Sequence, residues 1–447
     1  MDIDQIIGEI LPEHAENMDF VVKHMKAVML APGCGEQALN HLSIDQMKAA
    51  LPNLELVGLS VSWFVNNTDI ENIEIKPGVE KKLSETDDPW LVSNYDRSNA
   101  YKIHRSDVND PSTVRFGGTM PDDDVLLYAK ALKDSGLKVA FYPFLMVDNE
   151  NKDWRGVISS DAEHVADFSV QYNKFVMHYA ELLKDEVDTF YLGSELKGAT
   201  SIKDDNYEFP FVTNLINLAA DIRQILGTTA SISYAANWDE YHSCAGGFRP
   251  LDLLWSNQNI NFVGINYYMP LTNSYSSNIT IDQIKAGFKY GEGIDYFYVE
   301  SNKIMPFTNQ ANQLKNLAHW HSTDHWGWNP VTCESYQTSW IPESKPIIFS
   351  EFGFRSINNC TNQPNVYGDK LPKHSDGSLD FPLQMRAIRA ILEYIKETNF
   401  IKEGVCYCWD SRGYGWQIKY VDGKYWQSGH WIDGKIAKKI KDDSKNT

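Results

Sequence analysis

The chain has 447 residues, of which 43% are hydrophobic and 13% are aromatic, enough for a large buried core. Its 60 acidic residues outnumber its 41 basic residues and give a formal net charge of −19. Because this charge repels phosphate backbones and anionic lipid headgroups, the composition argues against binding to nucleic acid or to a membrane surface.

The cysteines and the N-terminal residues carry no sign of secretion. Six cysteines show neither a Cys-x-x-Cys pair nor the spacing of a zinc site, so we expect no dependence on disulfides. The acidic start at Met1 lacks a basic region followed by an apolar core, so no signal peptide is predicted. No apolar run approaches the length that spans a membrane.

Residues 1–53 are predicted to form a helical segment that packs on the outside of the main domain. Within it, residues 18–30 and 36–50 have the composition of helices. The first convincing strand covers residues 54–64, and a weaker second strand is predicted at residues 101–105.

Strand-like and helix-like segments then alternate regularly. The remaining strands are predicted at 137–146, 187–193, 228–236, 260–268, 345–351 and 404–410. Strands separated by helix-sized intervals imply parallel pairing with right-handed crossovers, and eight such units favour closure into a barrel. The predicted fold class is therefore α/β, a (β/α)8 TIM barrel that spans residues 54–434.

Two connections are too long for plain loops, and both are expected at the C-terminal rim of the barrel. Residues 271–344 form an insertion rich in Tyr, Trp and Asn, and residues 355–381 are rich in Asn, Pro and Gly. Both are positioned to wall a cleft. Near the end of the chain, residues 415–427 carry a hairpin signal, and residues 435–447 form a basic C-terminal tail.

Two of the predicted strands end in a glutamate that a glycine soon follows. Glu351 ends the seventh strand, and Glu195 follows the fourth. Barrel enzymes present catalytic groups at these tips, where two carboxylates about 5 Å apart can cleave a glycosidic bond with retention. Either glutamate alone would more often be an ordinary surface residue, but the repeated setting favours a catalytic pair.

A pair of this kind needs one protonated and one ionised carboxyl group. We expect Glu351 to stay ionised as the nucleophile, because neighbouring hydroxyl groups would hold its carboxylate. We expect Glu195, beside Ser194 and under apolar cover from Leu196, to have the higher pKa and to act as acid and then as base.

Aromatic and polar residues at the strand tips are candidates for sugar binding, because the C–H faces of sugar rings stack on aromatic rings. Core packing explains any single aromatic residue equally well. Loop capping is the commoner role of Asn266 and Asp148. The full set of substrate-binding candidates is Trp63, Asp148, Ser194, Trp238, Asn266, Tyr267, Tyr268 and Trp409.

A competing constellation lies in the insertion, where His319, His321, Asp324 and His325 look like metal ligands on a loop. This cluster lacks an established zinc spacing, so the sequence favours a protein without metal or other cofactor. A metal-dependent barrel enzyme stays an alternative that rests on this loop alone.

An ordered set of motifs runs through residues 193–198, 262–270, 345–353, 362–366 and 429–434. This set resembles the TIM-barrel-like domain of gene transfer agent and phage tail-tip proteins, a family similar to clan A glycoside hydrolases. The resemblance covers nearly the whole chain and implies a glycoside hydrolase barrel.

The resemblance also implies roles for individual residues. The acid/base of the clan matches Glu195, and its nucleophile matches Glu351. The clan tyrosine that bonds the nucleophile matches Tyr267 or Tyr268, and the eighth-strand tryptophan matches Trp409.

Two functions are compatible with these observations. The Glu195–Glu351 pair favours a retaining glycoside hydrolase that cleaves a β-linked polysaccharide or cell-envelope glycan. Ser194 stands where clan A enzymes usually place the asparagine that holds the sugar 2-hydroxyl. It favours a catalytically weak, glycan-binding barrel of a phage-tail-like or gene transfer agent apparatus. The resemblance implies a carbohydrate partner, phage-tail-like proteins as further partners, and a location in the cytoplasm or in a phage-like particle.

Overall fold

The structure is a computed structural model that describes residues 12–30, 42–79, 84, 89–104, 118–151, 153–300, 302–366 and 370–409. The predicted hairpin at residues 415–427 and the basic tail at residues 435–447 lie outside the described residues, as does the motif at residues 429–434.

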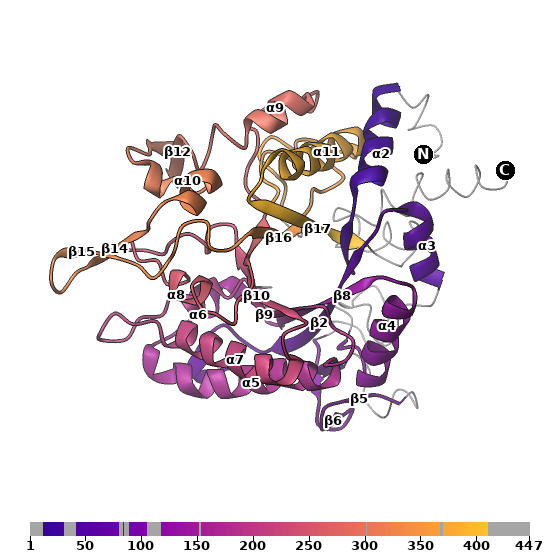
Figure 1. The fold of residues 1–447 in the computed structure, drawn as a ribbon, viewed down its shortest axis with the longest axis vertical. Helices are drawn as coiled ribbons and strands as arrows, with labels where there is room; N and C mark the ends of the chain where they lie inside the picture. The colour runs from indigo at the N-terminus through magenta and orange to yellow at the C-terminus, as the bar shows by residue number, and fades with distance from the viewer. Residues whose placement is uncertain are drawn as a thin grey trace.

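Eight parallel strands form a closed barrel at the centre of the molecule (Figure 1). Each strand pairs with its two neighbours, and the last pairing, between the first and second strands, closes the sheet. This arrangement confirms the predicted TIM-barrel fold. In order around the barrel the strands are β1 (Ala27–Leu30), β2 (Leu56–Val65), β8 (Lys138–Val147), β9 (Thr189–Ser194), β10 (Ser231–Asn237), β11 (Val263–Tyr267), β16 (Ile347–Phe352) and β17 (Ile401–Trp409).

The start of the barrel corrects the sequence analysis. The sequence predicts a helix over residues 18–30, but its last four residues form β1 because this apolar run is buried on all sides between β2 and β17. Residues 101–105 do not supply a barrel strand, since β7 (Tyr101–Lys102) pairs with β4 (Gly78–Val79) in a small separate sheet. The barrel therefore begins at residue 27. One barrel strand is missed in the sequence and one is wrongly predicted, so the later strands keep their predicted positions in the order.

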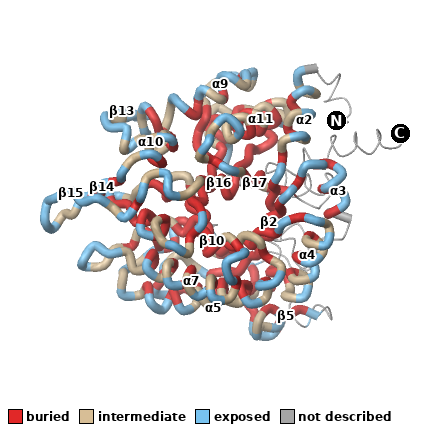
Figure 2. The backbone as a smooth tube through the Cα atoms, viewed as in Figure 1, coloured by how far each residue is buried: buried red, intermediate tan, exposed pale blue. Residues whose placement is uncertain are grey.

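Helices surround the barrel, as Figure 1 shows for the long α5 and α7 below the strands and α11 above them. Their inner faces are buried, whereas their outer faces are exposed (Figure 2). The helices are α2 (Pro12–His24), α3 (Leu42–Ala50), α4 (Asp122–Asp134), α5 (Val165–Leu182), α6 (Lys197–Thr200), α7 (Pro210–Leu226), α8 (Asp252–Trp255) and α11 (Phe381–Glu397), with the short turns η1 (Ile70–Asn72), η4 (Arg155–Val157) and η5 (Ala162–His164).

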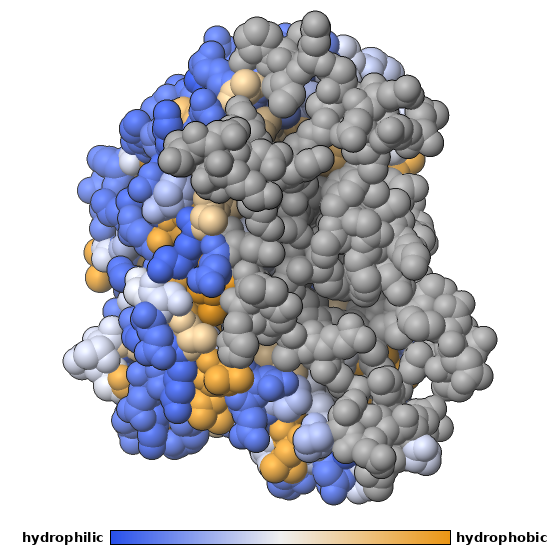
Figure 3. Space-filling model, turned by 90° about the vertical axis from the view of Figure 1, so that its right-hand side faces the viewer, coloured by the Kyte–Doolittle hydropathy of each residue, from blue (hydrophilic) through white to orange (hydrophobic). Residues whose placement is uncertain are grey.

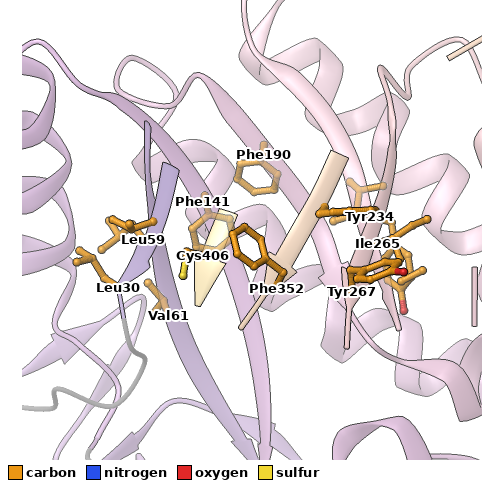
Figure 4. Packing of buried hydrophobic residues seen from close by; sticks show 14 of the residues in the cluster. Leu30, Leu59, Val61, Phe141, Phe190, Tyr234, Ile265, Tyr267, Phe352 and Cys406 are labelled. Carbon is orange, nitrogen blue, oxygen red and sulfur yellow. The ribbon is translucent and has the colours of Figure 1, made fainter. Parts of the chain in front are cut away.

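The barrel strands send alternate side chains to two separate hydrophobic layers. One layer fills the barrel interior and includes Tyr142 and Tyr191. The other lies between the barrel and the helices, and Phe141, Phe190 and Phe352 belong to it (Figure 4). Which layer a side chain enters decides whether it can reach the mouth of the barrel.

The insertion between β11 and β16 builds its own layer, and its hairpins project to one side of the barrel in Figure 1. The hairpins expose most of their residues to solvent (Figure 2). The elements are α9 (Ile281–Ala286), β12 (Tyr296–Glu300), β13 (Lys303–Pro306), η6 (Gln310–Asn312), α10 (Leu317–Ser322), β14 (Trp326–Asn329) and β15 (Glu334–Gln337). Short strands elsewhere are β3 (Ile75–Lys76), β5 (Leu91–Val92) and β6 (Tyr95–Asp96).

The surface agrees with the acidic, polar composition of the chain. On the face drawn in Figure 3, the described residues are mainly hydrophilic, and hydrophobic side chains occur in small separate groups. Within the described residues, no helix combines the length and the apolar character that crossing a membrane would require.

The close approach of β10 and β11 gives a test of the barrel. A Cβ atom at Gly264 would lie 2.3 Å from the carbonyl oxygen of Tyr234, so Gly264→Ala must push the two strands apart. We expect the free energy of unfolding in urea to fall by about 1–3 kcal/mol. Thr228→Ala, at an exposed position before β10, is the control. Equal stability of both variants would contradict the described pairing.

Candidate active site

Glu195 and Glu351 lie at the carboxyl ends of β9 and β16, the fourth and seventh barrel strands. In the sheet register, Glu351 is opposite Asn266 of β11, and Ser194 is opposite Ala235 of β10. Parallel strands bring their carboxyl ends to one rim, so the sequence-predicted pair shares the same end of the barrel.

Three donors surround the Glu195 carboxylate, which is 6% exposed. Nη2 of Arg155 lies 2.7 Å from Oε2, and Nε1 of Trp154 donates to the same oxygen at 3.0 Å. Nδ2 of Asn237 donates to Oε1 at 3.0 Å. Both oxygens of Glu195 are therefore engaged by the protein itself. Its backbone is in the left-handed region (φ 54°), where its N–H donates to the carbonyl oxygen of Ala235.

The Arg155 guanidinium is held in place independently of Glu195. Its Nε donates to the carbonyl oxygen of Ser194, and its Nη2 donates to Oγ of Ser194, both at 2.9 Å. The guanidinium carbon also lies 4.3 Å from the centre of the Phe144 ring. Ser194, which the sequence proposes as a sugar ligand, thus anchors the arginine that pairs with the neighbouring glutamate.

The Glu351 carboxyl group is 4% exposed and has a different environment. The Tyr268 hydroxyl donates to its Oε2 at 2.8 Å, which selects Tyr268 from the two tyrosines that the resemblance allowed. Its Oε1 has no hydrogen-bond partner among the described residues. Burial and the negative charge of Glu195 raise the pKa of Glu351 to about 7, against the opposing effects of Arg155 and the Tyr268 hydroxyl.

The ionisation of Glu351 differs from the sequence prediction. The sequence predicts an ionised Glu351, whereas burial and the negative charge of Glu195 raise the pKa of Glu351 to about 7. Arg155 pairs directly with Glu195. In the free protein, Glu351 therefore holds its proton below about pH 7.

A buried hydrogen-bond network lies inside the barrel between the two glutamates. The Tyr142 and Ser350 hydroxyls donate to Oδ1 of Asn266 at 2.7 and 2.8 Å. Nδ2 of Asn266 donates to Oγ of Ser194 at 3.4 Å, and this hydroxyl donates to the Tyr142 oxygen at 3.2 Å. The network brings the predicted Asn266 to the site, where it links β11 to β9 and β16.

A third buried carboxyl group, that of Glu240, supports the site from behind. It accepts hydrogen bonds from the Asn237 N–H at 2.9 Å and from the Thr200 and Tyr234 hydroxyls at 2.8 Å. Burial raises its pKa to about 7. By holding Asn237, it fixes the amide that contacts Glu195.

Several predicted binding residues do not reach this site. Trp63 is fully buried between β2 and α5, where it stacks on Phe175 at 4.9 Å and donates from Nε1 to the Tyr179 hydroxyl at 3.1 Å. Tyr267 stacks on Phe349 at 4.3 Å in the same outer layer. The structure therefore places neither ring where it could contact a substrate.

Trp409 also faces the helices and has no exposed surface. The pairing of β17 with β1 shifts register at this position, and Tyr407 contacts the inner layer of the barrel instead. Trp238 is half-buried beside Asn237 at the tip of β10, which keeps it near the site. Asp148 directly follows β8, and its Oδ2 accepts from the backbone N–H of His104 at 2.7 Å.

The histidines of the insertion have structural contacts. His325 contacts Oδ2 of Asp252 at 2.9 Å and the carbonyl oxygen of Trp320 at 2.7 Å. Nε2 of His321 contacts the carbonyl oxygen of Lys345 at 2.8 Å. In the part of the chain that the structure describes, no three His, Cys, Asp or Glu side chains group as metal ligands would.

Comparison with known proteins identifies the family of the chain and shows which solved structures share its fold. The sequence profile of the GTA TIM-barrel-like domain matches residues 170–415, more than half of the chain. No curated protein matches the sequence. A GH113 β-1,4-mannanase complex is 13% identical with a TM-score of 0.53, and the match covers 93% of this chain and 99% of that one.

A second similar structure is the GH113 β-mannanase of Alicyclobacillus acidocaldarius in complex with ManMIm. It is 14% identical, with a TM-score of 0.51, and the match covers 95% of this chain and 99% of that one. At such low identity, the likeness shows that the chains share the TIM-barrel fold.

The raised pKa of Glu351 predicts an effect on stability. Because the folded state binds this proton more tightly than a free carboxyl group with a pKa of 4.5, wild-type stability falls as the pH rises from 4.5 to about 7. Glu351→Gln removes this loss. The free energy of unfolding of the variant, measured relative to wild type, should therefore rise by roughly 1–3 kcal/mol from about pH 5 to pH 8.

Urea unfolding at both pH values measures this gain. Glu334→Gln, on the exposed strand β15, is the control and should show the same difference from wild type at both pH values. A Glu351→Gln difference that does not change with pH would contradict the assignment of the proton.

Proposed function

The chain belongs to the GTA TIM-barrel-like domain family, and on that premise we propose that it is a retaining glycoside hydrolase that cleaves a β-linked polysaccharide or cell-envelope glycan. The observation that carries this proposal is the carboxyl pair at one rim of the barrel. Oε1 of Glu351 has no hydrogen-bond partner among the described residues, and Glu195 lies close enough for its charge to raise the pKa of Glu351.

In the proposed reaction, Oε1 of Glu351 attacks the anomeric carbon while the bond from that carbon to the leaving oxygen breaks. Glu195 gives its proton to the leaving oxygen. Water then attacks the glycosyl ester on Glu351, and Glu195 takes the proton of that water. The Tyr268 hydroxyl positions the second oxygen of Glu351 throughout.

Substrate binding must first redistribute one proton and one ion pair. The proton that resides on Glu351 moves to Glu195, and Glu195 exchanges the Arg155 guanidinium for the leaving oxygen of the sugar. Arg155 keeps its two hydrogen bonds to Ser194 when Glu195 turns away. Positive charge that develops on the sugar ring favours an ionised Glu351, so the bound substrate itself supports this exchange.

The fold relatives guide the choice of substrate. Both similar structures are GH113 β-mannanases, and one is described as acting on β-1,4 linkages. Soluble β-1,4-linked manno-oligosaccharides are therefore the first substrates to test, followed by other β-glycans and peptidoglycan.

A second candidate function is a glycan-binding barrel of weak catalytic power within a phage-tail-like or gene transfer agent apparatus. The Arg155–Glu195 ion pair favours it, because a carboxylate held by a buried arginine is a poor proton donor. In this case the further partners are proteins of that apparatus, and the protein is located in a phage-like particle.

Substitution of each glutamate separates the two functions. Glu351→Gln should abolish turnover of every substrate, because the covalent intermediate forms on this residue. Glu195→Gln should slow natural glycans strongly but aryl glycosides with good leaving groups much less, since these need little protonation. A mechanism-based fluorosugar should add its mass to the peptide that contains Glu351. Label on any other peptide would contradict the assignment.

The Arg155 charge should set the pH dependence of turnover. Since Arg155 lowers the pKa of Glu351, Arg155→Met should raise it and shift the basic limb of kcat/KM to higher pH. The basic limb reports the free enzyme, in which Glu351 must still hold the proton that it passes to Glu195. Lys289→Met, at an exposed position of the insertion, is the control. An unchanged limb in the Arg155 variant would show that Arg155 does not act on Glu351.

A further inference from the structure

A cavity of about 540 Å³ lies in the insertion, and neither of the two glutamates lines it. Its walls are the loop of residues 270–279, the end of α9 and the segment of residues 287–296, with Lys315 at its floor. The volume falls within the range of roughly 300–1,000 Å³ that small-molecule sites occupy. The proposed reaction makes no use of this cavity.

The cavity begins close to the proposed active site. Pro270 lines it and follows Tyr268 by two residues. Because consecutive Cα atoms are about 3.8 Å apart, the Cα of Pro270 lies within about 8 Å of that of the tyrosine that donates to Glu351. One wall of the cavity is therefore continuous along the chain with the tip of β11.

The wall nearest the barrel is fixed by hydrogen bonds. The backbone N–H of Leu271 donates to the carbonyl oxygen of Thr361 at 2.9 Å. Oδ1 of Asn362 accepts from the Thr272 hydroxyl at 2.6 Å, and its Nδ2 donates to the carbonyl oxygen of Ser274 at 2.8 Å. These contacts tie the loop to the connection that follows β16, so the wall is held in place before any ligand binds.

The lining matches the chemistry of sugar hydroxyl groups. The lining includes neutral amides and hydroxyls, which both donate and accept hydrogen bonds. Tyr290 adds an aromatic ring that is 65% exposed, which suits stacking on the C–H face of a sugar. The polar uncharged lining residues away from the fixed wall are Asn273, Ser276, Asn278 and Gln283.

The charges of the lining point to a neutral ligand. Lys315 and Glu292 are its charged residues, so their formal charges cancel. The Lys315 ammonium donates to the carbonyl oxygens of Pro270 and Gly287 at 2.8 Å and of Tyr290 at 3.3 Å. All three of its protons are thus engaged by the walls, and none is left for an anionic group.

We propose that this cavity is a saccharide subsite that takes neutral sugar units of the glycan whose bond is cleaved between Glu195 and Glu351. This subsite proposal rests on the proposed function, and it narrows the substrate to a chain of uncharged sugars that is several units long. Such a subsite adds affinity for long chains without contacting the bond that breaks.

Calorimetry on the full chain tests the subsite, with Glu351→Gln as the background to prevent cleavage. The probes are β-1,4-linked mannohexaose and mannobiose. Tyr290→Ala removes the stacking ring, and Ala286→Trp fills the cavity from the exposed end of α9. Each should weaken binding of the hexaose by at least about fivefold and leave the biose unchanged.

The matched control is Tyr275→Ala, which removes an 85% exposed tyrosine of the same insertion that does not line the cavity. It should bind the hexaose like the background protein. Equal losses in the Tyr275 and Tyr290 variants, or no loss in the Tyr290 variant, would overturn the subsite. Failure of the background protein to bind the hexaose would overturn it as well.

Hydrolysis of the hexaose by protein with Glu351 intact separates this proposal from the proposed function. Cleavage by wild type together with unchanged affinity of the Tyr290 variant means that the hydrolase proposal stands and the subsite is wrong. Binding that depends on Tyr290 without any cleavage means that the subsite stands and the hydrolase proposal is wrong.

Discussion

The rim that carries the site exists because one short strand closes the barrel. β1 has four residues, and it pairs with β2 on one side and β17 on the other. All eight barrel strands are parallel neighbours, so closure turns their carboxyl ends into a ring. Residues far apart in the sequence then meet within that ring. The side chains of Tyr142, Ser194 and Asn266, for example, form hydrogen bonds of 2.7–3.4 Å with one another.

The charges of the site form a second constraint. Three carboxyl groups, of Glu195, Glu240 and Glu351, are buried near one arginine. Arg155 pairs with Glu195, and burial raises the pKa of the other two to about 7. Buried carboxyl groups without a cationic partner of their own keep protons near neutral pH, which a general acid needs. Because Arg155 pairs with Glu195, the location of the proton depends on which carboxylate the arginine contacts.

Sequence reasoning succeeds where local patterns carry the information. Apolar runs that end in a glutamate and a glycine located Glu195 and Glu351, and βα alternation predicted the barrel. It fails where tertiary packing decides. β1 lacks a turn signal before it and reads as the end of a helix. Trp154 and Arg155 lie in a loop whose sequence does not show that it folds back onto Glu195.

The same limit explains the aromatic residues and the ionisation of the pair. Trp63 lies near the end of β2 and Trp409 ends β17, but the alternation of side chains and a register shift turn them toward the helices. The ion pair of Glu195 depends on an arginine that is 40 residues away from it in the sequence. A pattern of residue types cannot reveal the contact between Arg155 and Glu195, because the contact forms only when the loop folds back onto the rim of the barrel.

The central claim is that the two glutamates cleave a β-glycoside by double displacement. Proton NMR of the first product formed from β-1,4-mannohexaose, recorded before mutarotation, tests it most directly. Two displacements at the anomeric carbon predict that the β configuration appears first and the α anomer grows in slowly. An α anomer as the first product, or no cleavage by the wild-type chain of any β-glycan offered, would contradict the account.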